Sequence, residues 1–320
     1  MRIWIVGGGS IGLLLAADLA VSGCDVVLVV RTDEQARAIG GSGVTVRQVG
    51  RPDVRVRLRA FAFEEASAGA GAGKPDWIVP AVKQYDLDDR FVQVLGSWVT
   101  QHGRVCAIQN GLGHEQKLMK TIPPERLRVA VTTVAARRRS FTEVERTGTG
   151  ITWMGRADRP QDWDGDDLAF AEALRKAGWP CEPGGDMRAR MWDKLVVNCL
   201  INPITAVLGV ENGRLLEDME ALSVLRDAFE EAVRIARAEG VRLSDGLWEA
   251  ALEVCRKTAL NRSSMLQDLD RGRKTEIDAL TGALLEAAER RGVDAPVNRT
   301  LHRLVRMLER RARPETEGRS

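Results

Sequence analysis

The sequence is poor in cysteine and has no excess of charge of either sign. Its five cysteines, Cys24, Cys106, Cys181, Cys199 and Cys255, are scattered and form no C-x-x-C pair. Such a set argues against a disulfide framework or a metal site and predicts a protein of a reducing compartment, the cytoplasm. Lysine and arginine number 47 against 45 aspartates and glutamates, a net charge of +2. This balance gives no bulk attraction for nucleic acid or for an anionic membrane.

Long hydrophobic runs are also missing. No stretch of about 18 uninterrupted apolar residues occurs, so we expect no transmembrane helix. The start "MRIWIVGGGSIGLLLAADLAVSG" resembles a signal peptide, but glycines interrupt its apolar run and no cleavage site follows, so we expect none. A hydrophobic content of 44% with 29% charged residues is typical of a soluble globular protein, and 320 residues suggest two domains.

The first half of the chain alternates short β-branched runs with helical patterns, the first helix beginning at about Ser10. The runs are "RIWIVG", "DVVLVVR", "DWIVPAV", "RVCAIQNG" and "LRVAVTTV". Strands that alternate with helices predict a parallel sheet covered on both faces. The N-terminal half is therefore expected to be a doubly wound α/β domain of the Rossmann type.

The second half carries almost only helical periodicity, and a linker rich in proline and glycine, "WPCEPGGD", precedes it at 179–186. Glycines 240, 272 and 292 mark helix stops or breaks. We predict a dinucleotide-binding domain over 1–185, an all-α substrate and catalytic domain over 186–313, and a disordered tail over 314–320. The composition of "EEASAGAGAGK", 64–74, predicts a flexible surface loop.

The stretch "VGGGSIG" has the G-x-G-x-x-G spacing between a predicted strand and a predicted helix. Gly7, Gly9 and Gly12 supply the three glycines, whose roles are a tight turn, close approach of the backbone to a pyrophosphate, and close packing of helix on strand. Glycine-rich turns also serve simply as turns, but the flanking strand and helix favour dinucleotide binding. The whole turn is the expected cofactor site: Gly7, Gly8, Gly9, Ser10, Ile11 and Gly12.

The second predicted strand indicates which dinucleotide is bound. An NAD enzyme has an acidic residue at the end of this strand, but "DVVLVVRT" ends in Arg31 and Thr32. A guanidinium pairs with a 2′-phosphate, so the sequence favours NADP(H). The alternative is a solvated surface arginine. Lys83, at the end of "WIVPAVK", is either a second contact for the adenosine phosphate or an ordinary strand-end lysine.

Two further polar features point to a substrate site. "IQNGLG" places Asn110 after a strand, near a nicotinamide ribose or a substrate oxygen, although Asn-Gly is also a common turn pair. In "MWDKLVVNCLINPITAVLG", Lys194, Asn198 and Asn202 recur at steps of four, which puts them on one side of an otherwise apolar helix. A lysine on a helix is usually solvated. Buried amines and amides, however, need partners, and a polar substrate cavity supplies them.

The stretch "NRSSMLQDLDRGRKTEID" adds the remaining candidates: Asn261, Ser263, Ser264, Asp268 and Glu276. Glu276 is the best placed carboxylate, after Gly272 and at the start of a new helical run. One straight helix over 264–276 would separate Ser264 from Glu276 by about 18 Å, too far for one small substrate. We therefore expect a break near "DRGRK". The alternative is a polar helix face with an ordinary acidic first turn.

Taken together, "VGGGSIG", "IQNGLG", "KLVVNCLINPITA" and "SSMLQDLDRGRKTEID" resemble the ketopantoate reductase (2-dehydropantoate 2-reductase) family over about residues 1–310. The resemblance implies a Rossmann domain that binds NADPH, a helical domain, and reduction of 2-dehydropantoate to (R)-pantoate in pantothenate and coenzyme A biosynthesis. The stretch "KQYDLDD" after Lys83 matches the family pattern only loosely.

The resemblance also implies a role for each candidate. Lys194 corresponds to the catalytic lysine of the family and Glu276 to its active-site glutamate, which also lies at the cofactor. The substrate residues implied are Asn110, Asn198, Asn202, Asn261 and Ser264, of which Ser264 holds the carboxylate and Asn110 also lies near the nicotinamide. Arg31 and Lys83 correspond to residues on the adenosine phosphate.

These roles give a mechanistic hypothesis. Lys194 as ammonium stabilises the carbonyl oxygen and delivers the proton, for which burial lowers its pKa toward roughly 7 to 8 while Glu276 opposes that shift. No histidine lies in a motif, which argues against a histidine acid. Two alternatives remain: a reductase of another small 2-oxo acid, and an NADP(H)-binding regulatory protein without turnover. The expected partner is a small molecule, with the chain a monomer or a homodimer.

Overall fold

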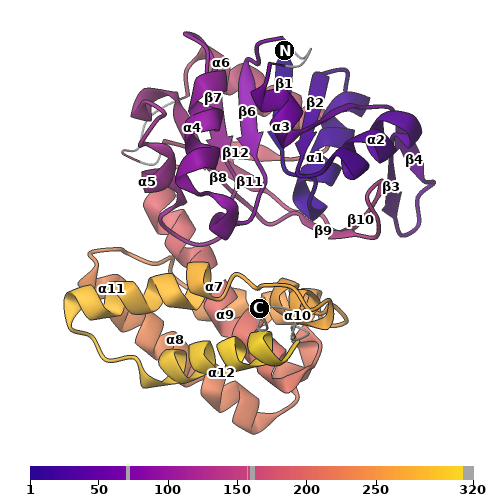
Figure 1. Ribbon diagram of the computed structural model, residues 1–320. Helices are drawn as coiled ribbons and strands as arrows, with labels where there is room; N and C mark the ends of the chain where they lie inside the picture. Colours follow the sequence, from indigo (N-terminus) through magenta and orange to yellow (C-terminus); the bar gives the residue numbers. More distant parts are fainter. Residues whose placement is uncertain (70–72, 157, 159–162, 313–320) are drawn as a thin grey trace, which may run out of the picture. The chain divides into compact units, whose positions relative to one another are not determined.

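The computed structural model of the protein describes residues 1–69, 73–156, 158 and 163–312 (Figure 1). The chain divides into two compact units. The first contains residues 1–109 and 114–187, and the second contains 110–113 and the chain from residue 188 onward. The tail expected at 314–320 lies outside the described residues.

The first unit is built on an eight-stranded sheet of order β12-β11-β8-β7-β6-β1-β2-β5. Neighbouring strands from β8 to β5 run parallel, whereas β11 is antiparallel to β8. The strands are β1 (Arg2–Val6), β2 (Asp25–Val30), β5 (Arg59–Ala62), β6 (Trp77–Pro80), β7 (Arg104–Ala107), β8 (Leu127–Thr132), β11 (Thr152–Gly155) and β12 (Cys181–Pro183). All five strands predicted from the sequence are present, and the predicted Rossmann-type sheet is confirmed.

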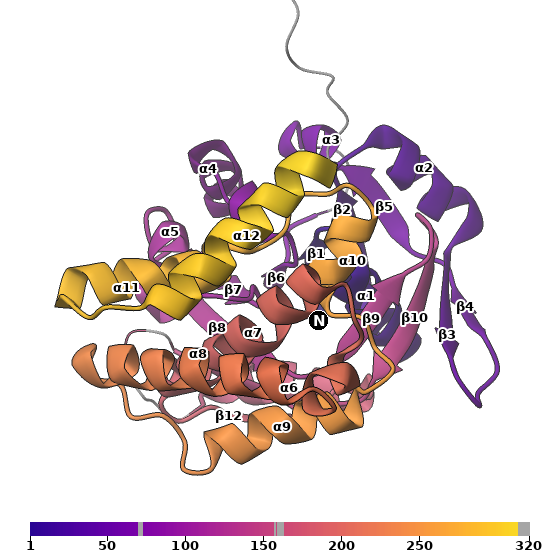
Figure 2. The same cartoon turned by 90° about the horizontal axis from the view of Figure 1, so that it is seen from below.

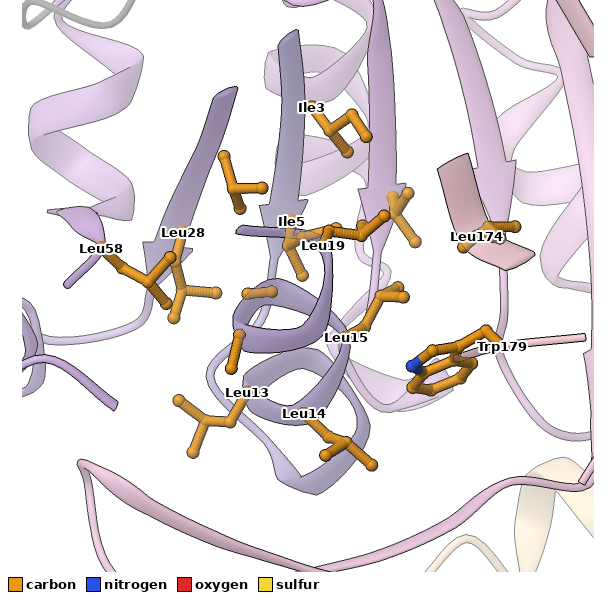
Figure 3. Packing of buried hydrophobic residues seen from close by; sticks show 14 of the residues in the cluster. Ile3, Ile5, Leu13, Leu14, Leu15, Leu19, Leu28, Leu58, Leu174 and Trp179 are labelled. Atoms are coloured by element: carbon orange, nitrogen blue, oxygen red, sulfur yellow. The ribbon is translucent and has the colours of Figure 1, made fainter. Parts of the chain in front are cut away.

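The central strands are covered on both faces, as their apolar runs predict. Successive side chains of a strand point to opposite faces, and Ile3, Trp4, Ile5 and Val6 of β1 are all buried. Figure 3 shows Ile3 and Ile5 packed with leucines of the helix that follows β1, among them Leu19. This packing holds that helix against the sheet.

The helices of the first unit follow the predicted alternation, with one correction. They are α1 (Ser10–Val21), α2 (Asp33–Ser42), α3 (Phe63–Ser67), η1 (Gln84–Asp86), α4 (Asp89–Trp98), α5 (His114–Leu118), η2 (Pro124–Arg126) and α6 (Gly165–Lys176). The stretch 64–74 was expected to be a loop, but its first residues belong to α3. Glu65 caps that helix by accepting a hydrogen bond from the Ala62 N–H at 3.0 Å. Residues 70–72 lie outside the described residues.

A second, four-stranded sheet was not predicted. Its order is β4-β3-β10-β9, formed by β3 (Val44–Gln48), β4 (Val54–Val56), β9 (Ala135–Arg138) and β10 (Glu143–Gly148). Strands β3 and β10 pair in parallel although about a hundred residues separate them, with Val46 opposite Val144. Such short, half-exposed strands carry little periodic signal, which is why the sequence did not reveal them.

The described part of the second unit is helical apart from its turns. Its elements are α7 (Met187–Leu208), η3 (Asn212–Leu216), α8 (Met219–Ala238), α9 (Leu247–Lys257), α10 (Ser264–Asp270), the π-helix η4 (Asp278–Gly282), α11 (Ala283–Arg291) and α12 (Pro296–Ala312). Figure 2 shows α8, α9, α11 and α12 arranged about α7. One buried cluster joins all five of these helices.

Helix α7 is the central element of this unit. Among the described residues, it is the one helix that is long and apolar enough to cross a membrane by length and composition. However, 67% of its apolar stretch is buried inside the protein. Core helices of soluble proteins pass the same test, and the packing of Trp192, Leu195 and Leu200 in the cluster fits that explanation. The helix continues through Pro203.

Glycines end or interrupt the helices of this unit where the sequence predicted. Gly240, Gly272 and Gly292 have φ values of +71°, +62° and +65°, which favour glycine. The break expected near "DRGRK" is present, since α10 ends before Gly272. A second break between α9 and α10 was not predicted. It arises because Ser263 caps a new helix by accepting a hydrogen bond from the Leu266 N–H at 3.2 Å.

Candidate active site

The glycine-rich turn of the first unit lies where the strand order of the sheet reverses. Strand β1 lies between β2 and β6, and ligands in open α/β sheets bind beyond the carboxyl ends of strands at such a point. Gly7 has a φ of +128°, and a Cβ there would be 2.6 Å from the carbonyl oxygen of Ala81. A Cβ on Gly12 would be 1.9 Å from the carbonyl oxygen of Gly7. Both positions therefore exclude a side chain for reasons internal to the fold.

The next residue of the turn is fixed by contacts from distant segments. The carbonyl oxygen of Gly8 accepts hydrogen bonds from Gln35 Nε2 at 3.0 Å and from Arg138 Nη1 at 2.9 Å. The backbone N–H of Arg138 donates to Ser10 Oγ at 3.0 Å. Strand β9, which carries Arg138, thus fixes the turn and the first residue of α1. Sequence reasoning missed this contact, because nothing in a chain separation of 130 residues signals it.

Gly9 differs from its neighbours because the fold leaves room beside it. Gly9 is the N-cap residue of α1 and makes no side-chain capping bond. The atom nearest to a Cβ added at Gly9 would be the carbonyl oxygen of Ala81, at 3.9 Å. Ser10 and Ile11 are the first residues of the helix, where backbone N–H groups lack helical acceptors. An open helix N-terminus of this kind suits a diphosphate.

Arg31 follows β2, as the sequence predicted, but it has a partner that the sequence did not reveal. Its Nη2 lies 2.6 Å from Asp86 Oδ1, and its side chain remains 73% exposed. Asp86 belongs to η1, for which Lys83 is the N-cap residue, so all three residues lie near the carboxyl ends of β2 and β6. An anion that binds Arg31 has to share this guanidinium with the Asp86 carboxylate.

In the second unit, α7 carries the predicted polar stripe within an apolar surface. Asn202 is buried, whereas Lys194 and Asn198 are half-buried. Their neighbours Leu195, Val196, Cys199 and Leu200 are at most 1% exposed. One amine and two amides of this helix therefore lie beside apolar side chains that water does not reach.

The amine of Lys194 is strongly influenced by this environment. Burial lowers its pKa from 10.5 to about 8, because removal of water disfavours the charged form, while the Glu276 carboxylate acts in the opposite direction. Both effects were expected from the sequence. An amine with this pKa exchanges protons readily near neutral pH.

Glu276 is the acidic partner, and it also contacts the segment 110–113 of the same unit. Its side chain is 5% exposed, and Asn110 Nδ2 lies 3.4 Å from its Oε2. The contact is close because Gly111 packs on the π-helix: a Cβ on Gly111 would be 2.2 Å from the Ala279 oxygen. Lys194, Glu276 and Asn110 thus form one cluster drawn from three parts of the chain.

The two remaining candidates lie beside the start of α10. Thr205 Oγ1 of α7 lies 2.8 Å from Ser263 Oγ, and the Asn261 carbonyl oxygen accepts from the Asn212 N–H at 2.9 Å. Ser263 is buried as the cap of α10, whereas Ser264 is exposed as its first residue. Ser263 therefore has a structural role, which leaves the exposed hydroxyl of Ser264 available to a ligand.

Comparison with known proteins places this geometry in a family. Residues 3–159 match the family model described as "Ketopantoate reductase PanE/ApbA", and residues 186–309 match "Ketopantoate reductase PanE/ApbA C terminal". The chain belongs to the ketopantoate reductase family. This is a family of oxidoreductases, and its two models together cover both the glycine-rich turn and the Lys194 cluster.

Curated ketopantoate reductases match nearly the whole chain. The 2-dehydropantoate 2-reductase of Archaeoglobus fulgidus is 34% identical over 96% of this chain and 98% of its own length. The enzyme of the same name from Bacillus subtilis is 34% identical over 97% of this chain and 98% of its own length.

Solved structures of the family have the same fold. A PanE/ApbA family ketopantoate reductase from Ralstonia eutropha JMP134 aligns with a TM-score of 0.86 at 29% identity, covering 98% of this chain and 99% of its own. The probable 2-dehydropantoate 2-reductase from Bacillus subtilis aligns with a TM-score of 0.78 at 32% identity, covering 96% and 100%. A D-mandelate dehydrogenase with NADH shares the fold at 24% identity and a TM-score of 0.86, covering 98% of this chain and 99% of its own.

The glycine-rich turn yields a stability prediction. Gly12→Ala forces a Cβ against a backbone carbonyl and should destabilise the protein by about 3 kcal/mol. Gly9→Ala meets no such obstacle and should cost less than about 1 kcal/mol, the scale of a weaker N-cap. Urea-induced unfolding of the two variants measures the difference. Equal losses would contradict the assignment of distinct roles to these glycines.

Proposed function

We propose that this protein reduces 2-dehydropantoate to (R)-pantoate with NADPH, a step of pantothenate and coenzyme A biosynthesis, with Lys194 as the general acid. Membership of the ketopantoate reductase family and the names of relatives at 34% identity support the substrate. The observation that carries the chemistry is the amine of Lys194, whose pKa is lowered to about 8 on the wall of α7. A cytoplasmic location and a monomeric or dimeric state stay predictions.

The first unit provides residues suited to the dinucleotide. The room beside Gly9 and the N-terminus of α1 fit the diphosphate, and the fixed backbone at Gly8 keeps the turn open. Arg31 would hold the 2′-phosphate of NADPH, with Lys83 as a second cation. Asp86 would then have to yield part of its contact with Arg31, which makes the choice between NADPH and NADH a matter for direct measurement.

The second unit provides the residues for reduction of a ketone. NADPH, when bound, supplies the hydride that the 2-oxo carbon receives. Lys194 as ammonium donates a hydrogen bond and then a proton to the carbonyl oxygen, which gains negative charge in this step. A pKa of about 8 leaves most of the amine protonated at neutral pH and still permits release of the proton.

Glu276 and the polar side chains around it would orient the substrate. The Glu276 carboxylate would either align the Lys194 amine or accept a hydrogen bond from the 4-hydroxyl of the substrate. Asn110 would restrain Glu276 and lie near the nicotinamide. The residues proposed to line the substrate site are Asn110, Asn198, Asn202, Asn261 and Ser264. Among these, Ser264 is proposed to hold the substrate carboxylate.

Two other functions compete with this proposal. A reductase of another small 2-oxo acid would use the same reacting groups, because the walls of a pocket decide the substrate. An NADP(H)-binding regulatory protein would have no need of Lys194, Glu276 and Ser264, and all three are present.

Substitution of Lys194 should slow the reduction step and leave cofactor binding unchanged. Lys194→Ala should lower kcat by about 100-fold or more while the Kd for NADPH stays unchanged. Lys194→Arg keeps a positive charge but does not release its proton, so it should also be inactive as an acid. Oxidation of NADPH with ketopantoate, followed by absorbance, measures both variants, with Lys257→Ala as the control. Wild-type turnover by Lys194→Ala would exclude the assigned role.

Substitution of Arg31 tests the cofactor. Arg31→Ala should weaken NADPH binding by about 10- to 100-fold, the scale of a hydrogen bond to a charged group, and leave NADH binding unchanged. Titration followed by fluorescence of the reduced nicotinamide gives both constants. Arg37→Ala, an exposed change on α2, is the matched control. Equal weakening of both dinucleotides would show that Arg31 does not read the 2′-phosphate.

A panel of 2-oxo acids tests the substrate. Ketopantoate should give the highest kcat/KM, because loss of a hydrogen-bonded hydroxyl or of a branched methyl group costs transition-state binding. Among the competitors, pyruvate is smaller, 2-oxoisovalerate lacks the hydroxymethyl group of ketopantoate, and phenylglyoxylate is aromatic. A higher kcat/KM for any of them would favour the alternative reductase.

A further inference from the structure

The segment that carries Glu276 is not held by a regular helix. Helix α10 ends at Asp270, and the chain turns at Gly272 before the π-helix begins at Asp278. π-helical turns are rare and occur frequently at functional sites. Because this segment lacks an unbroken helical ladder, contacts from elsewhere have to set the position of the Glu276 side chain.

Helix α12 contacts the segment immediately before Glu276. The N–H and the Oγ1 of Thr275 both donate to Glu309 Oε1, each at 2.6 Å. Thr275 Oγ1 also accepts from the Ile277 N–H at 3.1 Å, so one hydroxyl bridges both neighbours of Glu276. Thr275 is 1% and Glu309 7% exposed, and buried hydrogen bonds to a carboxylate are strong.

The same helix contacts the residue two positions after Glu276. Asp278 Oδ1 lies 3.0 Å from His302 Nε2 and 2.9 Å from Arg306 Nη1. These groups are partly exposed, so this second anchor is weaker than the first. Residues 302, 306 and 309 are spaced by four and three, which places them on one face of α12.

A third contact extends this face to the preceding turn. A Cβ on Gly272 would be 3.0 Å from the carbonyl oxygen of Ala312, the last residue of α12. Figure 2 shows the carboxyl-terminal end of α12 beside α10. Helix α12 therefore contacts this segment at Gly272, at Thr275 and at Asp278, while none of the α12 residues that make these contacts belongs to the proposed catalytic groups.

Building on the role proposed above for Glu276, we propose that α12 is a positioning element of the active site. Glu309, acting through Thr275, fixes the Glu276 carboxylate from one side, and His302 with Arg306, acting through Asp278, fixes it from the other. These residues set how closely Glu276 approaches Lys194 and the segment at Asn110. A purely structural role for α12 would affect stability and leave the Lys194 amine as it is.

A charge-neutral pair of variants tests this role. Thr275→Val removes the hydroxyl that links Glu309 to the backbone at Ile277, whereas Thr275→Ser keeps it. Thr300→Val, an exposed change on α12 that removes a hydrogen bond to the Pro296 carbonyl oxygen, is the matched control. Glu276→Gln gives the limit at which the carboxylate charge is lost altogether. Thermal unfolding and circular dichroism establish that each variant is folded.

The readout is the pKa of Lys194 in the ligand-free protein. The rate of acetylation of this amine by acetic anhydride, measured by mass spectrometry across a pH series, reports that pKa directly. Glu276 raises the pKa of Lys194, so a carboxylate that moves away should lower it below about 8. We expect the lower value in Glu276→Gln, a smaller shift in the same direction in Thr275→Val, and none in Thr275→Ser or Thr300→Val.

Turnover supplies a second readout. Thr275→Val should lower kcat by roughly 10-fold with no change in the Kd for NADPH, as expected for a misplaced catalytic group. A wild-type pKa of Lys194 in folded Thr275→Val, or an equal shift in Thr275→Ser, would overturn the positioning role. Should the wild type not reduce ketopantoate, the proposed function fails while the acetylation result still decides the role of α12.

A milder variant covers the case in which Thr275→Val does not fold. Arg306→Gln loosens the exposed second anchor and leaves the buried one intact. Loss of a positive charge alone would raise the pKa of a nearby amine, whereas release of Glu276 lowers it. A lowered pKa of Lys194 would therefore support positioning, and an unchanged or raised pKa would contradict it.

Discussion

The rest of the site depends on the pKa of the Lys194 amine, which burial lowers and the Glu276 carboxylate raises. The apolar residues of α7 that exclude water from the amine also form the core of the second unit. The same packing that stabilises the helical unit therefore lowers the pKa of Lys194, and Glu276 limits how far it falls. A change to either side of this balance alters the protonation of the amine.

In both units, contacts with the rest of the fold hold the candidate functional groups in place. In the first unit, close packing leaves no room for a side chain at Gly7 or Gly12. Hydrogen bonds from Gln35 and Arg138 hold the carbonyl group of Gly8, and the space beside Gly9 remains free of protein atoms. In the second, α7 fixes the amine, while the carboxylate is placed by an irregular segment. An irregular segment can direct a side chain that a regular helix cannot, but it requires contacts such as those from α12.

Local patterns were sufficient to predict five parallel strands of the main sheet and the helical character of the second unit. The strands β1 and β2 and the helix between them follow from apolar runs, periodicity and the glycine spacing, and the break before Glu276 follows from Gly272. The second sheet was missed because its pairing of β3 with β10 joins distant segments, and β5, β11 and β12 of the main sheet were missed because such short strands carry weak signals. The loop expected at 64–74 was partly wrong because Glu65 caps a short helix there.

The site was predictable in its residue types and less so in its contacts. Steps of four on an apolar helix indicated Lys194, Asn198 and Asn202, and the burial expected there predicted a lowered pKa for Lys194, toward roughly 7 to 8. The pairing of Arg31 with Asp86, the hydrogen bond between Thr205 and Ser263 and the link from Thr275 to Glu309 are tertiary contacts between separate segments. No local pattern in the sequence specifies which distant polar groups meet.

The pH dependence of kcat/KM for ketopantoate tests the central claim most directly, because this quantity reports ionisations of the enzyme before ketopantoate binds. A proton donor with a pKa of about 8 predicts a kcat/KM that is constant at neutral pH and falls tenfold per pH unit above about pH 8. A kcat/KM that stays constant to pH 10 would contradict the assignment of Lys194 as the acid.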